Sequence, residues 1–267
     1  MSSFRDLAIQ GELLNDLEGV RIANGNRIFA MLAPVEKGGM GLDESHPGVR
    51  NSQTIGDVLQ TAEDLSTKEL RRILKATALH PWLKAQVGIG EKQGARLLAV
   101  IGHPLWRHDP ITDEWHPRTI AQLWAYCGYH VVKGESPKRK RGEQGNWNTE
   151  ARTRTYLIAE SCVKQMHSPY RAVYDEGRAK YAESLHDGEC KRCGPSGKPA
   201  QPGSPLSAGH QHARAMRLMA KAILKDLWLA ARDAEDTVHA VQDFDGAISA
   251  PTPISSAPRP LKEAIPA

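Results

Sequence analysis

The chain lacks a long hydrophobic run. No stretch of its 267 residues approaches the roughly 20 consecutive apolar residues that a membrane-spanning helix needs. The N-terminal segment MSSFRDLAIQ carries acidic and polar side chains where a secretory signal peptide requires an apolar core. These absences argue against a membrane or secreted protein, so we expect a cytoplasmic protein without a membrane partner.

Cysteine is also scarce, with four residues in the whole chain. Two of them, Cys127 and Cys162, stand alone in the sequence. A secreted disulfide framework would need more cysteines at regular spacings. We therefore expect reduced thiols.

The chain has little excess charge, and its net charge of +4 permits a nucleic-acid partner without requiring one. Clusters of basic residues are therefore a better indicator of such a partner than the net charge. Strand-like alternation and internal repeats are also lacking, whereas helical periodicity recurs. With 40% hydrophobic residues, the chain is predicted to form a mostly α-helical fold around one core, with appendages.

Between Leu83 and Gly102 the sequence has the pattern of a helix-hairpin-helix. Gly88 and Gly90 allow a tight turn and Ile89 packs beneath it, so that a second helix opens at the following residues. The free N–H groups and positive dipole end of such a helix bind phosphate. We predict DNA contacts in this motif from Gly88, Ile89, Gly90, Lys92 and Gln93. An ordinary structural turn is the alternative.

A basic loop follows, from Lys133 to Gly142. Its cationic residues, together with two arginines of the next predicted helix, are candidate phosphate ligands: Lys133, Lys138, Arg139, Lys140, Arg141, Arg152 and Arg154. A solvated charge run is the alternative. Trp147 can either stack on an unpaired base or anchor the loop on the core.

Cys190 and Cys193 are separated by two residues, as in half of many zinc sites, within an insertion at about 186–212. His210 with His212 completes a candidate ligand set, and His186 is the alternative fourth ligand. His210 and His212 can share one ion only if the following helix starts after them. Structural zinc, unligated reduced cysteines and a redox pair remain open.

Three regions follow from these patterns. Residues 1–80 form an N-terminal helical segment, in which Ser66 and Glu69 are interpreted as a capping box and Asp57, Glu63 and Asp64 as solvated. Residues 81–235 form the helix-hairpin-helix domain with the Cys/His insertion. Residues 245–267 are rich in Pro, Ala and Ser and are predicted to be a disordered tail.

The ordered set GIGEKQGARLLAVIG, IAQLWAYCGY and a basic loop ending in GNWNTEARTRTYLIAES resembles the C-terminal half of one family. That family is the insertion-sequence transposases related to pilin-inversion recombinases, the bridge-RNA-guided recombinases. The resemblance spans roughly residues 83–234. It implies a transposase domain in which Ser136 is the nucleophile, while the family's RuvC-like nuclease domain with its acidic tetrad is expected to be absent.

Two functional hypotheses result. The first is a DNA-binding protein of a mobile element or phage that acts in transposition or site-specific recombination, contacting phosphates with low sequence selectivity. It is either a recombinase subunit that uses Ser136 or a non-autonomous DNA-binding derivative, with guide RNA, a full-length transposase or a second copy as further partners. The second is a zinc-stapled helical protein-interaction module without DNA chemistry.

Overall fold

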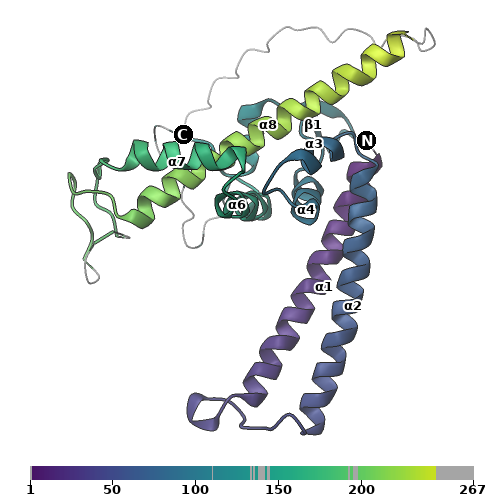
Figure 1. The fold of residues 1–267 in the computed structure, drawn as a ribbon, viewed down its shortest axis with the longest axis vertical. Coiled ribbons are helices and arrows are strands. Elements are labelled where there is room, and N and C mark those ends of the chain that lie inside the picture. The colour runs from purple at the N-terminus through teal and green to yellow at the C-terminus, as the bar shows by residue number, and fades with distance from the viewer. Residues whose placement is uncertain are drawn as a thin grey trace.

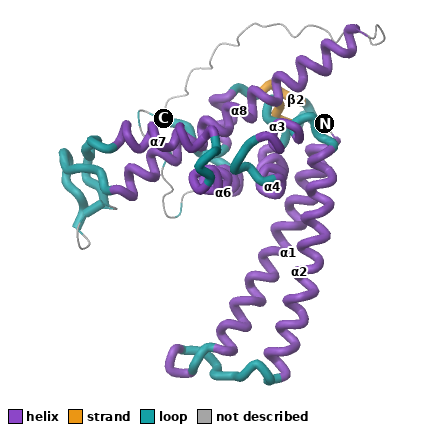
Figure 2. Tube along the Cα trace, in the orientation of Figure 1, coloured by secondary structure: helices purple, strands orange, loops and turns teal. Residues whose placement is uncertain are grey.

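The computed structural model describes residues 2–244 except 110, 133, 135, 138–141, 143, 144, 192 and 195–197. In this part of the chain helices dominate, which confirms the mostly α-helical prediction (Figure 2). In chain order the elements are α1 (Ser2–Leu32), η1 (Val35–Lys37), α2 (Pro47–Lys75), α3 (His80–Ala85), α4 (Glu91–Ile101), β1 (Trp106–His108), β2 (Trp115–Pro117), α5 (Ile120–Tyr126), α6 (Thr149–Lys164), α7 (Pro169–Tyr181) and α8 (Ala208–Phe244). The predicted tail lies outside the described residues.

Helices α1 and α2 form a long antiparallel hairpin that extends away from the other helices (Figure 1). Hydrogen bonds join the two helices both near the core and nearer the tip of the hairpin. Near the body, Gln10 Nε2 donates to Ser66 Oγ at 2.8 Å, and farther out Asn24 Nδ2 donates to the Ser52 carbonyl at 2.7 Å.

The predicted capping box at Ser66 is wrong, because α2 runs without interruption from Pro47 to Lys75. Ser66 is buried against α1 instead. The helix begins after His46, whose ring Nδ1 accepts a hydrogen bond from the Gly48 N–H, and Pro47 occupies the first turn, where its missing N–H costs nothing.

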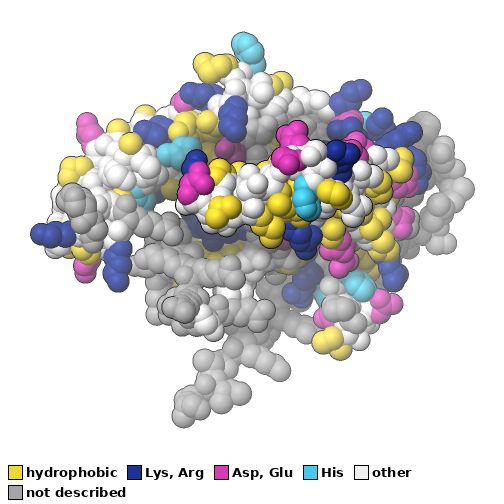
Figure 3. Space-filling view, turned by 90° about the horizontal axis from the view of Figure 1, so that it is seen from below, with side chains coloured by type: hydrophobic (Ala, Val, Ile, Leu, Met, Phe, Trp, Pro, Cys, Tyr) yellow, Lys and Arg dark blue, Asp and Glu magenta, His cyan; other side chains and the backbone are white. Residues whose placement is uncertain are grey.

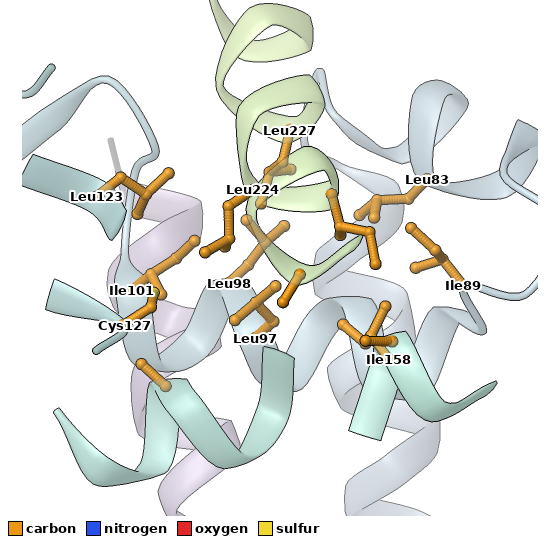
Figure 4. Packing of buried hydrophobic residues seen from close by; sticks show 14 of the residues in the cluster. Leu83, Ile89, Leu97, Leu98, Ile101, Leu123, Cys127, Ile158, Leu224 and Leu227 are labelled. Carbon is orange, nitrogen blue, oxygen red and sulfur yellow. The ribbon is translucent and has the colours of Figure 1, made fainter. Parts of the chain in front are cut away.

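The core lies where α4 meets α8, α6 and the base of the hairpin (Figure 4). Leu97 and Leu98 of α4 pack toward Leu224 and Leu227 of α8, and all four are essentially fully buried. Ile158 of α6 closes one side. Leu7, Leu14, Leu70 and Leu74 join the same cluster, so the base of the hairpin shares this core.

Helix α7 packs antiparallel on the first half of α8, where Arg178 donates to the Ala208 carbonyl and Gly177 lies against Ala215. Between the two helices, the described residues of 182–207 form a loop at one end of the molecule (Figure 2). A two-stranded antiparallel ribbon, β1 with β2, was not predicted from the sequence. None of the described helices is both long and apolar enough to cross a membrane.

Candidate metal centre and nucleic-acid interface

Four side chains of the α7–α8 segment converge: His186, Cys190, Cys193 and His210. One potential ligand atom from each lies within 4.8 Å of all the others. The two thiol sulfurs lie 4.0 Å and 3.3 Å from His210 Nδ1. A tetrahedral ion with usual Zn–S and Zn–N bond lengths would set such pairs about 3.5 Å apart, so the group has the dimensions of a metal site.

Backbone pairing of the loop places the cysteines. Cys190 and Ala200 exchange two N–H···O=C bonds of 2.9 Å, which form an isolated antiparallel bridge. His186 is tied to the returning strand in the same way, since its N–H donates to the Ser204 carbonyl at 2.9 Å and its carbonyl accepts from Gly203. The ligand-bearing loop is therefore a folded knuckle rather than an unstructured linker.

The fourth side chain comes from the first turn of α8. Ser207 precedes this helix, and the His210 N–H donates to the Ser207 carbonyl at 2.9 Å and contacts its hydroxyl at 3.2 Å. The same hydroxyl lies 3.1 Å from Cys193 Sγ. Ser207 thus fixes the helix start and touches a potential ligand, as residues that orient metal ligands do.

The burial of His186 supports an ion at this place. Its side chain is 5% exposed, and its Nε2 is buried without a hydrogen-bond partner. Leaving a buried polar atom unpaired costs about 1–3 kcal/mol. A metal ion bonded to this nitrogen would remove that cost, so the donor set fits a metal.

His212 does not belong to the group, which corrects the predicted ligand set. Helix α8 starts at Ala208, before both histidines, and side chains two residues apart on a helix point in diverging directions. His212 Nδ1 lies 2.8 Å from the Tyr174 hydroxyl of α7 instead. His186, the alternative ligand, takes the fourth position.

The α3–α4 connection has the local geometry expected of the hairpin motif. Gly88 has a φ of +96°, and a Cβ there would lie 2.9 Å from the Cys162 Cα, so only glycine fits. Ile89 is buried in the core. Gly90 is the exposed N-cap of α4, and its Cβ position is open.

Two side chains predicted to contact DNA from this motif have other surroundings. Lys92 Nζ lies 3.2 Å from Glu63 Oε1, and Arg21 bonds the other oxygen at 2.7 Å. Glu63 is 4% exposed, so its interpretation as solvated is wrong. Burial opposes its ionisation, but the two hydrogen bonds outweigh burial and lower the pKa of Glu63. Gln93 turns its Oε1 inward, where it is buried without a partner.

The two arginines of α6 differ. Arg154 donates to Asn15 at 2.7 Å and pairs with Glu150 at 3.3 Å, which ties α6 to α1. Arg152 has no carboxylate partner among the described residues. It lies over the rings of Tyr129 and Trp147, at 5.9 Å and 5.5 Å from their centroids.

The basic loop is described only in part. Lys133, Lys138, Arg139, Lys140 and Arg141 lie outside the described residues. Ser136, the candidate nucleophile, is half-buried, and its hydroxyl makes no hydrogen bond within the described part of the chain. Trp147 anchors the end of the loop, because Gly128, with a φ of +71°, leaves room for the indole where a Cβ would approach it to 2.7 Å.

No protein-family model, no curated protein and no solved structure gives a significant match to this chain.

Proposed function

We propose that this chain is a DNA-binding protein of a mobile element or phage, stapled by structural zinc, that acts in transposition or site-specific recombination. The observation that carries DNA binding is the Gly88–Gly90 turn. It opens α4 at an exposed glycine, where the first N–H groups of the helix and its positive dipole end can receive a phosphate. The sequence resemblance to the C-terminal half of the transposases is the reason for proposing transposition or site-specific recombination.

The proposed zinc ion is structural. Four protein donors fill a tetrahedral shell and leave no position for water or substrate, which is the arrangement of structural zinc sites. Two cysteines and two histidines are typical ligands of such sites. Free thiols and zinc thiolates persist in a reducing compartment, in keeping with the proposed cytoplasmic location.

We favour a non-autonomous DNA-binding derivative over an active nuclease. In the described part of the chain, the residues before α3 form α1, η1 and α2 and supply no strand that bears an acidic tetrad. Ser136 remains the candidate nucleophile of a recombinase subunit that would act with a full-length transposase or a guide RNA.

The α4 N-terminus can be tested by Gly90→Asp. Aspartate suits an N-cap with the φ of −73° and ψ of 145° seen at Gly90, so helix stability should be kept or improved. Its negative charge would repel a phosphate from the N–H groups at this helix start. We expect DNA affinity, measured by fluorescence anisotropy, to fall at least about tenfold, which is about 1.4 kcal/mol.

Gly90→Asn is the matched control, because asparagine caps equally well and carries no charge. Its DNA affinity should stay close to that of the wild type. Equal affinities for Gly90→Asp, Gly90→Asn and the wild type would show that the N-terminus of α4 does not bind DNA.

One observation favours the second candidate, a protein-interaction module. The helical hairpin exposes hydrophobic side chains at seven-residue spacing, with Leu13 and Val20 on α1 and Val58 and Leu65 on α2, each 47% to 64% exposed. From the side of the hairpin tip, hydrophobic side chains lie scattered among acidic and basic ones (Figure 3). Apolar side chains at seven-residue spacing along a helix can pack against a protein partner or a second copy. Phosphate contacts weaken steeply with salt and apolar contacts do not, so salt dependence separates the two candidates.

A further inference from the structure

Two groups of cations in the described chain have contrasting surroundings. The cations between the α1–α2 hairpin, α4 and α6 are paired with carboxylates: Arg21 and Lys92 with Glu63, Arg96 with Glu18, and Arg154 with Glu150. Charges neutralised in this way have little attraction left for an incoming anion.

Helix α8 carries the other group. Arg214, Arg217, Lys221 and Lys225 follow one another at intervals of three and four residues, which places them on one face of the helix. Within the described residues, no ion pair joins any of the four to a carboxylate. At 1.5 Å per residue their row is about 16 Å long, enough to face several phosphates of one strand.

Arg152 of α6 joins this row. Arg152 and Arg217 both lie over the ring of Tyr129, at 5.9 Å and 5.7 Å from its centroid. Burial and the neighbouring Arg152 lower the pKa of Arg217, and burial and Arg217 lower the pKa of Lys221. The cations therefore lie close enough to repel one another, and an anion would relieve that repulsion.

The basic loop begins and ends beside the same residues. Arg217 Nη2 donates to the His130 carbonyl at 2.8 Å, three residues before Lys133, and Arg152 covers Trp147 at the other end of the loop. Both ring nitrogens of His130 are buried without a hydrogen-bond partner. Unpaired polar atoms and unpaired cations thus meet at one place on the chain.

We propose that Arg152, Arg214, Arg217, Lys221 and Lys225, the α8 ridge, bind the phosphodiester backbone of DNA. The proposal rests on the proposed DNA-binding function and adds to the α4 N-terminus a second surface, to which the basic loop is attached. Lys92 and Arg154, which the sequence predicted to contact DNA, belong to the group that is paired with carboxylates.

The test uses two double variants of the full chain, Arg214→Gln with Lys225→Gln and Arg217→Gln with Lys221→Gln. Lys225 is exposed, and within the described residues the one contact of the Arg214 side chain is with the ring of Tyr181, so the first variant should fold normally even if the second does not. The probe is a DNA duplex of about 30 base pairs, measured by anisotropy over a salt series. Each lost phosphate contact reduces the slope of log K against log salt by about 0.9, so we expect each double variant to reduce it by about 1.8.

Lys37→Gln is the matched control. Lys37 is an exposed lysine at the tip of the hairpin, far from α8, and its loss should leave the slope unchanged (Figure 1). A wild-type slope in the first double variant, in a protein whose affinity falls with Gly90→Asp, would overturn the ridge and leave the proposed function standing. A wild-type chain that binds no DNA at low salt would overturn both. An RNA duplex that loses affinity in the double variants while DNA does not would overturn the assignment to DNA.

Discussion

At the scale of single residues, the metal group depends on the direction in which each histidine points. His210 and His212 differ by two positions on α8, which turns them to different neighbours. His210 meets the thiols and His212 meets Tyr174. His210 therefore belongs to the candidate metal group, and His212 belongs to the packing of two helices.

This difference predicts the behaviour of two histidine variants. We expect purified wild-type protein and His212→Ala to contain about one zinc ion per chain, because His212 is not a ligand. His186→Ala should lose its zinc to a mild chelator, because one of four donors is gone and the ion becomes accessible. The measurement is elemental analysis before and after chelator treatment.

Loss of zinc in His212→Ala but not in His186→Ala would contradict the ligand set. Protein without zinc in the wild type, prepared under reducing conditions, would dismiss the metal altogether. Cys193→Ser serves as a positive control for a missing ligand.

Only part of the candidate metal group was predictable from the sequence. The Cys190–Cys193 spacing and the downstream His210 indicated it, because the residue types and the close spacing of the cysteines are local properties. The choice between His186 and His212 depended on where α8 begins, and helix ends are the least certain feature of a sequence-based prediction. Glu63 shows the same limit, since its partners Arg21 and Lys92 are distant in the sequence.

At the scale of the elements, the two glycines of the α3–α4 connection, Gly88 and Gly90, have different roles. Gly88 sits at a positive φ against the backbone of α6, whereas Gly90 has an ordinary φ and open space around it. The first glycine shapes the turn, and the second keeps the N-terminus of α4 accessible.

We therefore expect unequal costs for two alanine substitutions. Gly88→Ala should lower the free energy of unfolding by about 1–2 kcal/mol or more, because alanine resists that φ and would contact Cys162. Gly90→Ala should change it by no more than about 0.5 kcal/mol, because a weaker N-cap and a less flexible unfolded chain act in opposite directions. Urea unfolding followed by circular dichroism measures both, and equal costs would show that the turn is not built as described.

The sequence predicted several elements correctly and missed others for identifiable reasons. The helix predicted after the basic loop is α6, which Asn148 caps with its Oδ1 2.9 Å from the Ala151 N–H. The Ser66–Glu69 pattern failed because the same residue types also occur inside a helix when a neighbour donates to the serine hydroxyl, as Gln10 Nε2 does to Ser66 Oγ. A capping box is present instead at Thr119 and Gln122. The β1–β2 ribbon was missed because strands of three residues are too short to show alternation.

At the scale of the whole molecule, a small net charge conceals an uneven distribution. The paired cations hold the hairpin, α4 and α6 together, while the α8 ridge carries charge without carboxylate partners among the described residues. The sequence could predict the helical class and the hairpin motif. It could not separate the two groups of cations, because each pairing is set by contacts between distant segments.

The proposed function requires that this chain bind DNA through phosphate contacts. Its most direct test is fluorescence anisotropy of the wild-type protein with duplex, branched and single-stranded DNA between about 50 and about 200 mM salt. With six or more phosphate contacts, we expect affinity to fall by about a thousandfold or more over this range and to depend little on sequence. Absence of binding at the lowest salt, or binding that salt does not weaken, would contradict it and favour a protein partner at the exposed face of the hairpin.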